Sequence, residues 1–226
     1  MFTTLEFQIG LLQITQSVLT SWLILVALLI LSWLLTRHLS MQPGKYQIVL
    51  ESIYQVMHDA VNDVLPEQVD LVFPFIATLW IFILISNLIG VIPGLHSPTA
   101  DLSVTACLAI LTFFSVHWFG IQSEGLKNYL QHYIKPSPFL LPFHLISELS
   151  RTLALAVRLF GNMMSLELTA LIVLLVAGFL APVPILLLHI IEAIIQAYIF
   201  GMLALIYIAG GIQSYELKRT KESHNE

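Results

Sequence analysis

The segment Leu153-Ala-Leu-Ala-Val-Arg-Leu-Phe-Gly-Asn-Met-Met164 decides how this chain folds, because it is an apolar sequence that carries one arginine. It belongs to a mostly apolar stretch at 143–179, and about 20 such residues are enough to cross a bilayer as a helix. A cation near the bilayer centre costs roughly 3 kcal/mol or more, and a guanidinium stays charged at cellular pH. The sequence therefore predicts a transmembrane helix in which Arg158 has a function.

The composition indicates an integral membrane protein. Of the 226 residues, 58% are hydrophobic and 10% are charged, whereas soluble domains are about half apolar and about a quarter charged. The net charge is -5 and the chain has no basic patch, so we predict no nucleic-acid partner. The chain also lacks a Gly-rich phosphate loop, so it is not expected to bind nucleotide directly. The single Cys107 excludes a disulfide framework, and no cofactor or metal site is predicted.

Five apolar stretches are long enough to span a membrane. They lie at 17–36, 71–92, 102–121, 143–179 and 183–212, and the last two are long enough to tilt. The sequence thus predicts an all-α integral membrane protein forming one membrane domain, 1–226. Its expected parts are an N-terminal tail with the first span (1–40), an amphipathic surface helix (44–65), a helical hairpin (68–122) and two long helices (139–218).

The 44–65 segment differs from the spans because apolar and polar residues alternate in it with helical periodicity. Tyr46, Val49, Leu50 and Ile53 share one face of such a helix, and Gln47, Glu51, Gln55 and Asp59 share the other. This pattern is typical of a helix that lies on the membrane surface. The polar face is acidic, which favours a partner subunit over anionic lipid as its contact.

The positions of Lys and Arg predict the orientation. Outside the spans, cations follow only the first, third and fifth of them: Arg37, Lys45, Lys127, Lys135, Lys218, Arg219 and Lys221. Cytoplasmic loops carry the excess of positive residues. We therefore expect the N-terminus outside and the C-terminus in the cytoplasm.

The last two spans carry polar residues that are able to face each other. Asn162 lies four residues after Arg158 on the same helix face, and Glu167 lies about 13 Å beyond Arg158 along the axis. The fifth span has a set with i, i+3, i+7 spacing: His189, Glu192 and Gln196. Matching the depths of two antiparallel helices predicts three pairs, Arg158 with Gln196, Asn162 with Glu192 and Glu167 with His189. Sliding one helix by a turn would change these pairs.

The chemistry of this polar series favours proton transfer. Glu167, His189 and Glu192 can take up and release protons, and such groups inside a membrane are typical of proton relays. Arg158 does not relay protons, but its charge attracts a carboxylate and opposes the passage of protons. A relay that ends at a fixed cation is half of a pathway, so we expect a moving acid on a partner.

The motif Arg158-Leu-Phe-Gly-Asn162, followed by Glu167 and by Leu188-His-Ile-Ile-Glu-Ala-Ile-Ile-Gln-Ala-Tyr-Ile-Phe200, resembles subunit a of F-type ATP synthases. Two further stretches are similar to that family, Ser86-Asn-Leu-Ile-Gly-Val-Ile-Pro-Gly94 and Ser97-Pro-Thr-Ala-Asp-Leu-Ser-Val-Thr105. The resemblance covers about residues 65–215. The first span and the surface helix agree with the family in layout only.

The resemblance implies that Arg158 faces the carboxylate of a rotating ring of c subunits. Protons would reach the ring from outside near Glu167, His189 and Glu192, and would leave through a cytoplasmic half-channel beyond Arg158. Asn87, Asn162 and Gln196 complete the set of expected ion-path residues. Rotation would drive ATP synthesis in a soluble head, so the chain itself is not an enzyme. Peripheral-stalk b subunits and membrane lipid are the other implied partners, and the bacterial inner membrane is the implied location.

Several alternatives remain open from the sequence. Glu192 stands where many family members are apolar, so a Na⁺-translocating version is possible. A proton-coupled secondary transporter would show internal repeats, and a voltage sensor would show regularly spaced arginines; neither pattern is apparent. Asn87, Asn162 and Gln196 could instead form interhelical hydrogen bonds. Asp101 is expected to cap a helix.

Overall fold

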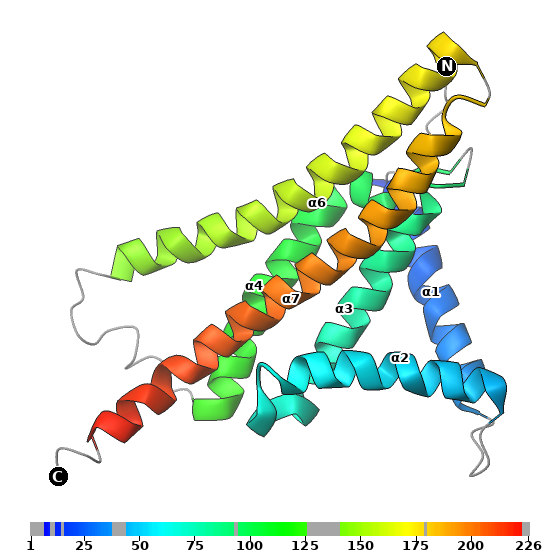
Figure 1. Cartoon of the computed structure of the whole chain (residues 1–226). Helices are drawn as coiled ribbons and strands as arrows, with labels where there is room; N and C mark the ends of the chain where they lie inside the picture. The colour runs from blue at the N-terminus through cyan, green and yellow to red at the C-terminus, as the bar shows by residue number, and fades with distance from the viewer. Residues whose placement is uncertain are drawn as a thin grey trace.

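The computed structural model describes residues 7–9, 12–14, 16–37, 44–92, 95–125, 141–178 and 180–222 of the chain. Its helices are α1 (Gln16–Thr36), α2 (Lys45–Asn62), α3 (Val69–Ile89), α4 (Leu102–Glu124), α6 (Leu141–Ala177) and α7 (Val183–Glu222), as Figure 1 shows. Two 3-10 turns, η1 (Pro66–Gln68) and η2 (Pro98–Ala100), precede α3 and α4. Strands β1 (Phe7–Ile9) and β2 (Leu12–Ile14) form a small antiparallel hairpin that the sequence did not predict. The predicted all-α class is confirmed.

The five predicted spans are also confirmed. The segments of membrane-crossing length and composition are Gln16–Thr36, Pro66–Ile89, Leu102–Ser123, Ile146–Ala177 and Val183–Ile212. Their surfaces are largely apolar, and in α1 only Ser21 and Ile24 are buried. Because a bilayer offers no hydrogen bonds to the backbone, long apolar helices of this kind are the form in which such segments cross it.

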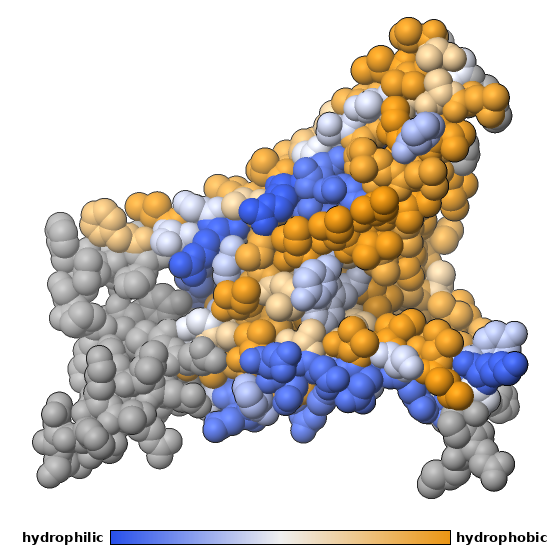
Figure 2. Space-filling view, viewed as in Figure 1, coloured by the Kyte–Doolittle hydropathy of each residue, from blue (hydrophilic) through white to orange (hydrophobic). Residues whose placement is uncertain are grey.

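Helix α2 is the additional, non-spanning helix, and it runs across the ends of α1 and α3 (Figure 1). Tyr54 and His58 stack on each other and both meet the edge of Phe73 on α3, with ring centroids 4.9 and 5.4 Å from that ring. Val61 is fully buried near the end of α2. Most of the helix is exposed, and polar side chains line the edge visible in Figure 2.

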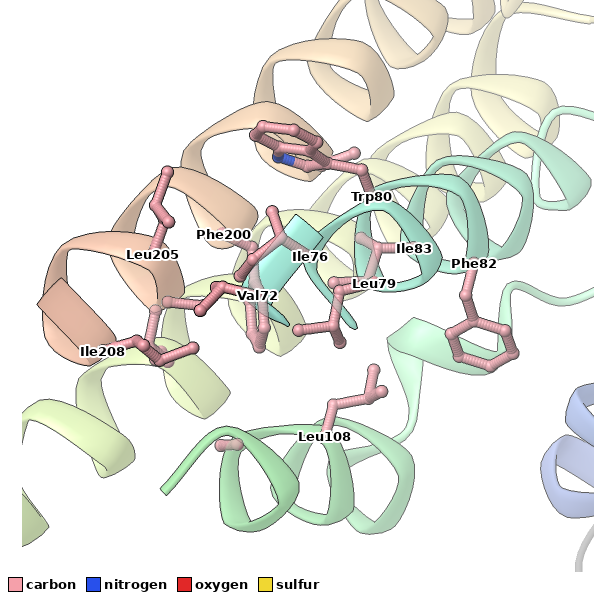
Figure 3. Close-up of a cluster of buried hydrophobic side chains, with 14 of the residues drawn as sticks. Val72, Ile76, Leu79, Trp80, Phe82, Ile83, Leu108, Phe200, Leu205 and Ile208 are labelled. Carbon is pink, nitrogen blue, oxygen red and sulfur yellow. The ribbon is translucent and has the colours of Figure 1, made fainter. Parts of the chain in front are cut away.

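The core lies where α7 packs against α3 and α4, and α6 covers α4 and α7. Figure 3 shows large apolar side chains of α3 facing those of α7, with Leu108 of α4 beside them. Trp80 of α3 donates its indole N–H to the Tyr198 carbonyl at 3.2 Å, and the two rings stack. A Cβ atom on Gly201 would collide with the Trp80 indole. The close approach at Gly201 therefore fixes how far α7 lies along α3.

Glycines and one carboxylate set the helix ends. Gly125 follows α4 with φ 80°, and Gly178 follows α6 with φ 86°, positive φ values that glycine adopts without strain. Asp101 accepts a hydrogen bond from the Ser103 N–H at 2.9 Å, so its predicted capping role is confirmed. The turn at Gly178 returns the chain, and α7 then runs antiparallel beside α6 (Figure 1).

Candidate functional site

The polar residues of α6 fall into three zones along its axis. Glu148 and Arg151 lie near its start, Arg158 and Asn162 near its middle, and Glu167 towards its end. At 1.5 Å per residue, Glu148 lies about 15 Å and Glu167 about 13 Å from Arg158. In Figure 2 hydrophilic side chains interrupt the apolar surface along this helix.

Arg158 is exposed on the surface of α6. Within the described part of the chain it makes no ion pair, because the ion pairs there join histidines to Asp59, Glu167 and Glu148. Arg151 differs, since its guanidinium lies 5.5 Å from the centre of the Tyr207 ring. The apolar neighbour Val157 is 59% exposed. The side chain of Arg158 is therefore open to a group that belongs to another molecule.

The middle of the site contains an amide pair between α6 and α7. Asn162 Nδ2 donates to Gln196 Oε1 at 2.8 Å, so the predicted pairs of Arg158 with Gln196 and of Asn162 with Glu192 are wrong. Asn162 thus pairs with a residue four positions, or about one helical turn, after the Glu192 that matching the depths of the two helices predicted. Packing of α7 on α3 sets this depth through the contact at Gly201, which the spacing of polar residues alone does not reveal.

Glu167 is the centre of a second cluster, the Glu167 cluster, formed with Gly90, His96, Ser97 and His189. The Ser97 N–H donates to Glu167 Oε1 at 2.6 Å, and His96 Nδ1 lies 3.5 Å from Glu167 Oε2. A Cβ atom on Gly90 would lie 2.9 Å from Glu167 Oε1 and 3.1 Å from His189 Cε1. The carboxylate of α6 and the imidazole of α7 thus meet at Gly90, just after the end of α3.

Buried hydrogen bonds hold η2 against α3 and α7 beside this cluster. Thr99 Oγ1 donates to Asn87 Oδ1 at 2.6 Å, and Asn87 Nδ2 donates to the Ala193 carbonyl at 3.4 Å. Ser97 Oγ donates to the Ser86 carbonyl at 2.8 Å. Asn87 is fully buried, so its amide joins three elements.

Three buried polar atoms near these groups have no hydrogen-bond partner among the described residues: Ser86 Oγ, His189 Nε2 and Gln196 Nε2. Buried polar atoms in folded proteins nearly always have a partner, and ordered water is a common one. His189 and Gln196 are each 1% exposed, and they lie on one face of α7. Water along this face of α7 would satisfy both side chains.

Several residues of these clusters could not be recognised from the sequence. Glu148 Oε2 lies 3.7 Å from His117 Nε2 of α4, and Gly90, His96 and Ser97 belong to the Glu167 cluster. Gly90 and Ser97 belong to the family-like stretches 86–94 and 97–105. No periodicity connects the residues of a turn with a helix 70 positions later, so only the folded structure brings them together.

The fold and these clusters define a multi-pass membrane protein whose two longest helices carry polar groups between them. Residues 18–209 match the family described as ATP synthase A chain. A protein of Legionella pneumophila, "ATP synthase subunit a", is 72% identical over 96% of this chain and 95% of its own length. "ATP synthase subunit a 2" of Pelobacter propionicus is 60% identical over 95% and 94%, and "ATP synthase subunit a 1" of Crocosphaera subtropica is 41% identical over 91% and 90%.

The chain therefore belongs to the ATP synthase A chain family, as its motifs predicted. It is a non-catalytic membrane subunit that acts in ATP synthesis and ion transport as part of a larger complex. Its membrane-length helices and its bacterial relatives identify a multi-pass protein of a bacterial inner membrane.

Proposed function

We propose that this chain passes protons between the two sides of the membrane and the c-ring of a rotary ATP synthase, with Arg158 facing the ring carboxylate. The observation that carries the proposal is the exposure of Arg158 on an apolar helix, without an ion-pair partner in the described part of the chain. A guanidinium in a low-dielectric setting strongly attracts a carboxylate. A carboxylate on a moving ring provides the charge that this position lacks.

The permanent charge of Arg158 divides the path into two halves. Protons do not cross the guanidinium, since it repels them and does not give up its own proton at cellular pH. They must therefore bind the ring carboxylate on one side of Arg158 and leave it on the other. Proton flow then requires the ring to rotate.

The uptake half contains Glu167, His189 and Glu192. Glu167 and His189 meet at Gly90, and Glu192 lies about one helical turn beyond His189 on α7. Asn87 anchors this region, and the Asn162–Gln196 pair lies between it and the level of Arg158. The release half begins beyond Arg158, where Glu148 and His117 offer proton-exchanging groups.

The distribution of cations supports an outside location for the Glu167 cluster. The cluster lies just after α3 and in the second half of α6, whereas Lys and Arg outside the spans precede these two helices in the sequence. Such residues accumulate in the cytoplasm. The N-terminus is then outside and the C-terminus inside. The exposed faces of α1 and α2 offer apolar area to lipid and to peripheral-stalk b subunits.

The groups on the path favour the proton over Na⁺. A Na⁺ path needs several oxygen ligands around one point, whereas this path alternates carboxylate and imidazole. Imidazole exchanges protons near neutral pH and binds Na⁺ poorly, because hard cations prefer oxygen.

The experiment that tests the proposal is Arg158→Ala in the complete synthase in membrane vesicles. We expect proton-driven ATP synthesis and ATP-driven proton pumping to vanish, while the detached soluble head still hydrolyses ATP. Arg37→Ala is the matched control, since Arg37 lies at the end of α1 and packs on Trp33, and it should pump normally.

Normal pumping by Arg158→Ala would overturn the proposal. The transporter alternative has a separate test, because a stator subunit should be purified together with a c-ring and an ATPase head. A chain that is purified alone and transports a solute after reconstitution would support the transporter instead.

A further inference from the structure

We propose that His96 is the proton-collecting residue of the uptake half, which takes protons from the outer solution and passes them to Glu167. This proposal rests on the function proposed above, and it adds a residue that the motifs do not include. His96 lies in the turn between α3 and η2, outside the membrane-spanning helices.

The geometry assigns different roles to the two oxygens of Glu167. Oε1 accepts the Ser97 N–H at 2.6 Å, which fixes the carboxylate against the turn. Oε2 faces His96 Nδ1 at 3.5 Å, slightly longer than the range of about 2.6–3.2 Å for direct proton transfer, so a small rotation of the exposed His96 ring brings the two atoms within reach. The backbone bond thus leaves Oε2 as the oxygen that is open to exchange with His96.

Exposure decreases steadily along the three groups. The His96 side chain is 62% exposed, that of Glu167 is 18% exposed and His189 is 1% exposed. On the inner side of the cluster, Gly90 and Ser97 pack closely around Glu167 Oε1. His96 is therefore the member of the series that meets the solution, and His189 is the member nearest to the core.

Other charged and titratable groups lie near this series on the neighbouring helices. Glu192 lies about one helical turn beyond His189 on α7, and Asp101 at the start of α4 is occupied in capping that helix. Glu167 is the acid that pairs with His96. The acid that faces His96 is thus also the group that receives its proton.

Both ring nitrogens of His96 take part in the transfer of a proton from the solution to Glu167. A hydronium ion gives a proton to Nε2 of His96 and becomes water, so the ring is a cation with both nitrogens protonated. The Nδ1–H bond then breaks and a bond forms to Glu167 Oε2, which leaves a neutral ring and a neutral carboxylic acid. After Glu167 has passed its proton inward, exchange with water removes the proton from Nε2 of His96 and returns one to Nδ1. The ring is then again in the tautomer with which it began.

The test compares His96→Gln, His96→Ala and the control His58→Gln in liposomes that contain the complete synthase. His58 is a histidine of α2 that packs on Tyr54 and Phe73.

ATP synthesis driven by an imposed proton gradient is measured as a function of the pH of the outer solution. At about pH 7.5 in weak buffer we expect both His96 variants to lose activity on the order of tenfold, which is less than the roughly 100-fold or larger effect of a positioned acid–base group, because water can still deliver protons to Glu167. At about pH 5, where hydronium is abundant and imidazole is protonated, the loss should nearly disappear.

Added imidazole should restore His96→Ala, since a free imidazole can take the place of the missing side chain, and it should not change His58→Gln. Unaltered rates in both His96 variants at all pH values would overturn the proposal. A loss that is equal at every pH and that imidazole does not restore would also overturn it, since it indicates a structural role. Arg158→Ala in the same liposomes separates the two proposals, because only the failure of the proposed function would leave that variant active.

Discussion

At the scale of single residues, the described polar side chains of α6 and α7 differ in whether the chain itself supplies their partners. Asn162 and Gln196 bond to each other, and Glu167 is held by Ser97. Arg158 has no ion pair within the described ranges. Polar groups in a membrane are normally paired within the protein, so an unpaired arginine points to an interaction outside the chain.

The Asn162–Gln196 bond has a measurable energy. Replacing one partner, as in Asn162→Leu or Gln196→Leu, leaves the other amide without its bond and should lower the melting temperature of the purified subunit. The double variant should lose less than the sum of the single losses. A coupling of about 0.6 kcal/mol, and at most about 1.7 kcal/mol, is typical of hydrogen bonds between membrane helices. Strictly additive losses in a thermal double-mutant cycle would show that the two amides do not interact.

The identities of the polar residues could be predicted from the sequence, but their pairing could not. Arg158 and Glu167 stand out because charges are rare in apolar stretches. The pairing of Gln196 depends on how deep α7 lies, and that depth follows from the contact of Trp80 with Gly201. His96 has no periodic neighbours at all, and its proximity to Glu167 arises from the conformation of the turn.

At the scale of helices, the contact between α3 and α7 positions the site. Gly201 admits the Trp80 indole, which donates a hydrogen bond to the Tyr198 carbonyl at 3.2 Å. Tyr198 lies only two residues beyond Gln196. The depth of Gln196 relative to Asn162 is therefore coupled to this contact, although neither Trp80 nor Gly201 belongs to the ion path.

Gly201→Ala should separate α7 from α3, because the new Cβ would overlap the Trp80 indole. Overpacking of this kind costs about 1–3 kcal/mol, so the melting temperature of the purified subunit should fall. Trp80→Leu combined with Gly201→Ala should recover part of the loss. Gly210→Ala is the control, since nothing lies within 4 Å of its added Cβ. Equal stability of Gly201→Ala and Gly210→Ala would contradict this account of the contact.

The extents of the spanning helices were predictable because the bilayer fixes their length. The stretch predicted at 17–36 is the helix Gln16–Thr36, and the one predicted at 102–121 is Leu102–Glu124. Helix α7 continues to Glu222, beyond the span predicted at 183–212 and four residues beyond the helix end predicted at 218, because bilayer thickness does not limit a helix outside the membrane. The β1–β2 hairpin was missed because three-residue strands give too few alternations to recognise.

At the scale of the whole molecule, the surface is built for contacts on several sides. Exposed large apolar residues occur on each of the spanning helices, and they include Trp22 at 67% and Trp118 at 69%. In α2 the apolar residues Tyr46 and Val56 are 90% and 70% exposed. Lipid is able to cover the helices that span the bilayer. The acidic polar face of α2 favours a protein partner there, as expected for a subunit of a larger complex.

The orientation of the molecule can be tested in a Cys107→Ser background with a membrane-impermeant maleimide. Leu95→Cys lies in the turn beside the Glu167 cluster, and Tyr46→Cys lies at the start of α2. Because Arg37 and Lys45 flank the same membrane side as Tyr46, and positive residues remain in the cytoplasm, intact cells should label Leu95→Cys alone. Inverted vesicles should label Tyr46→Cys alone, and detergent should expose both sites, which controls for reactivity. The opposite pattern would place the Glu167 cluster in the cytoplasm, and the uptake and release halves of the path would then exchange roles.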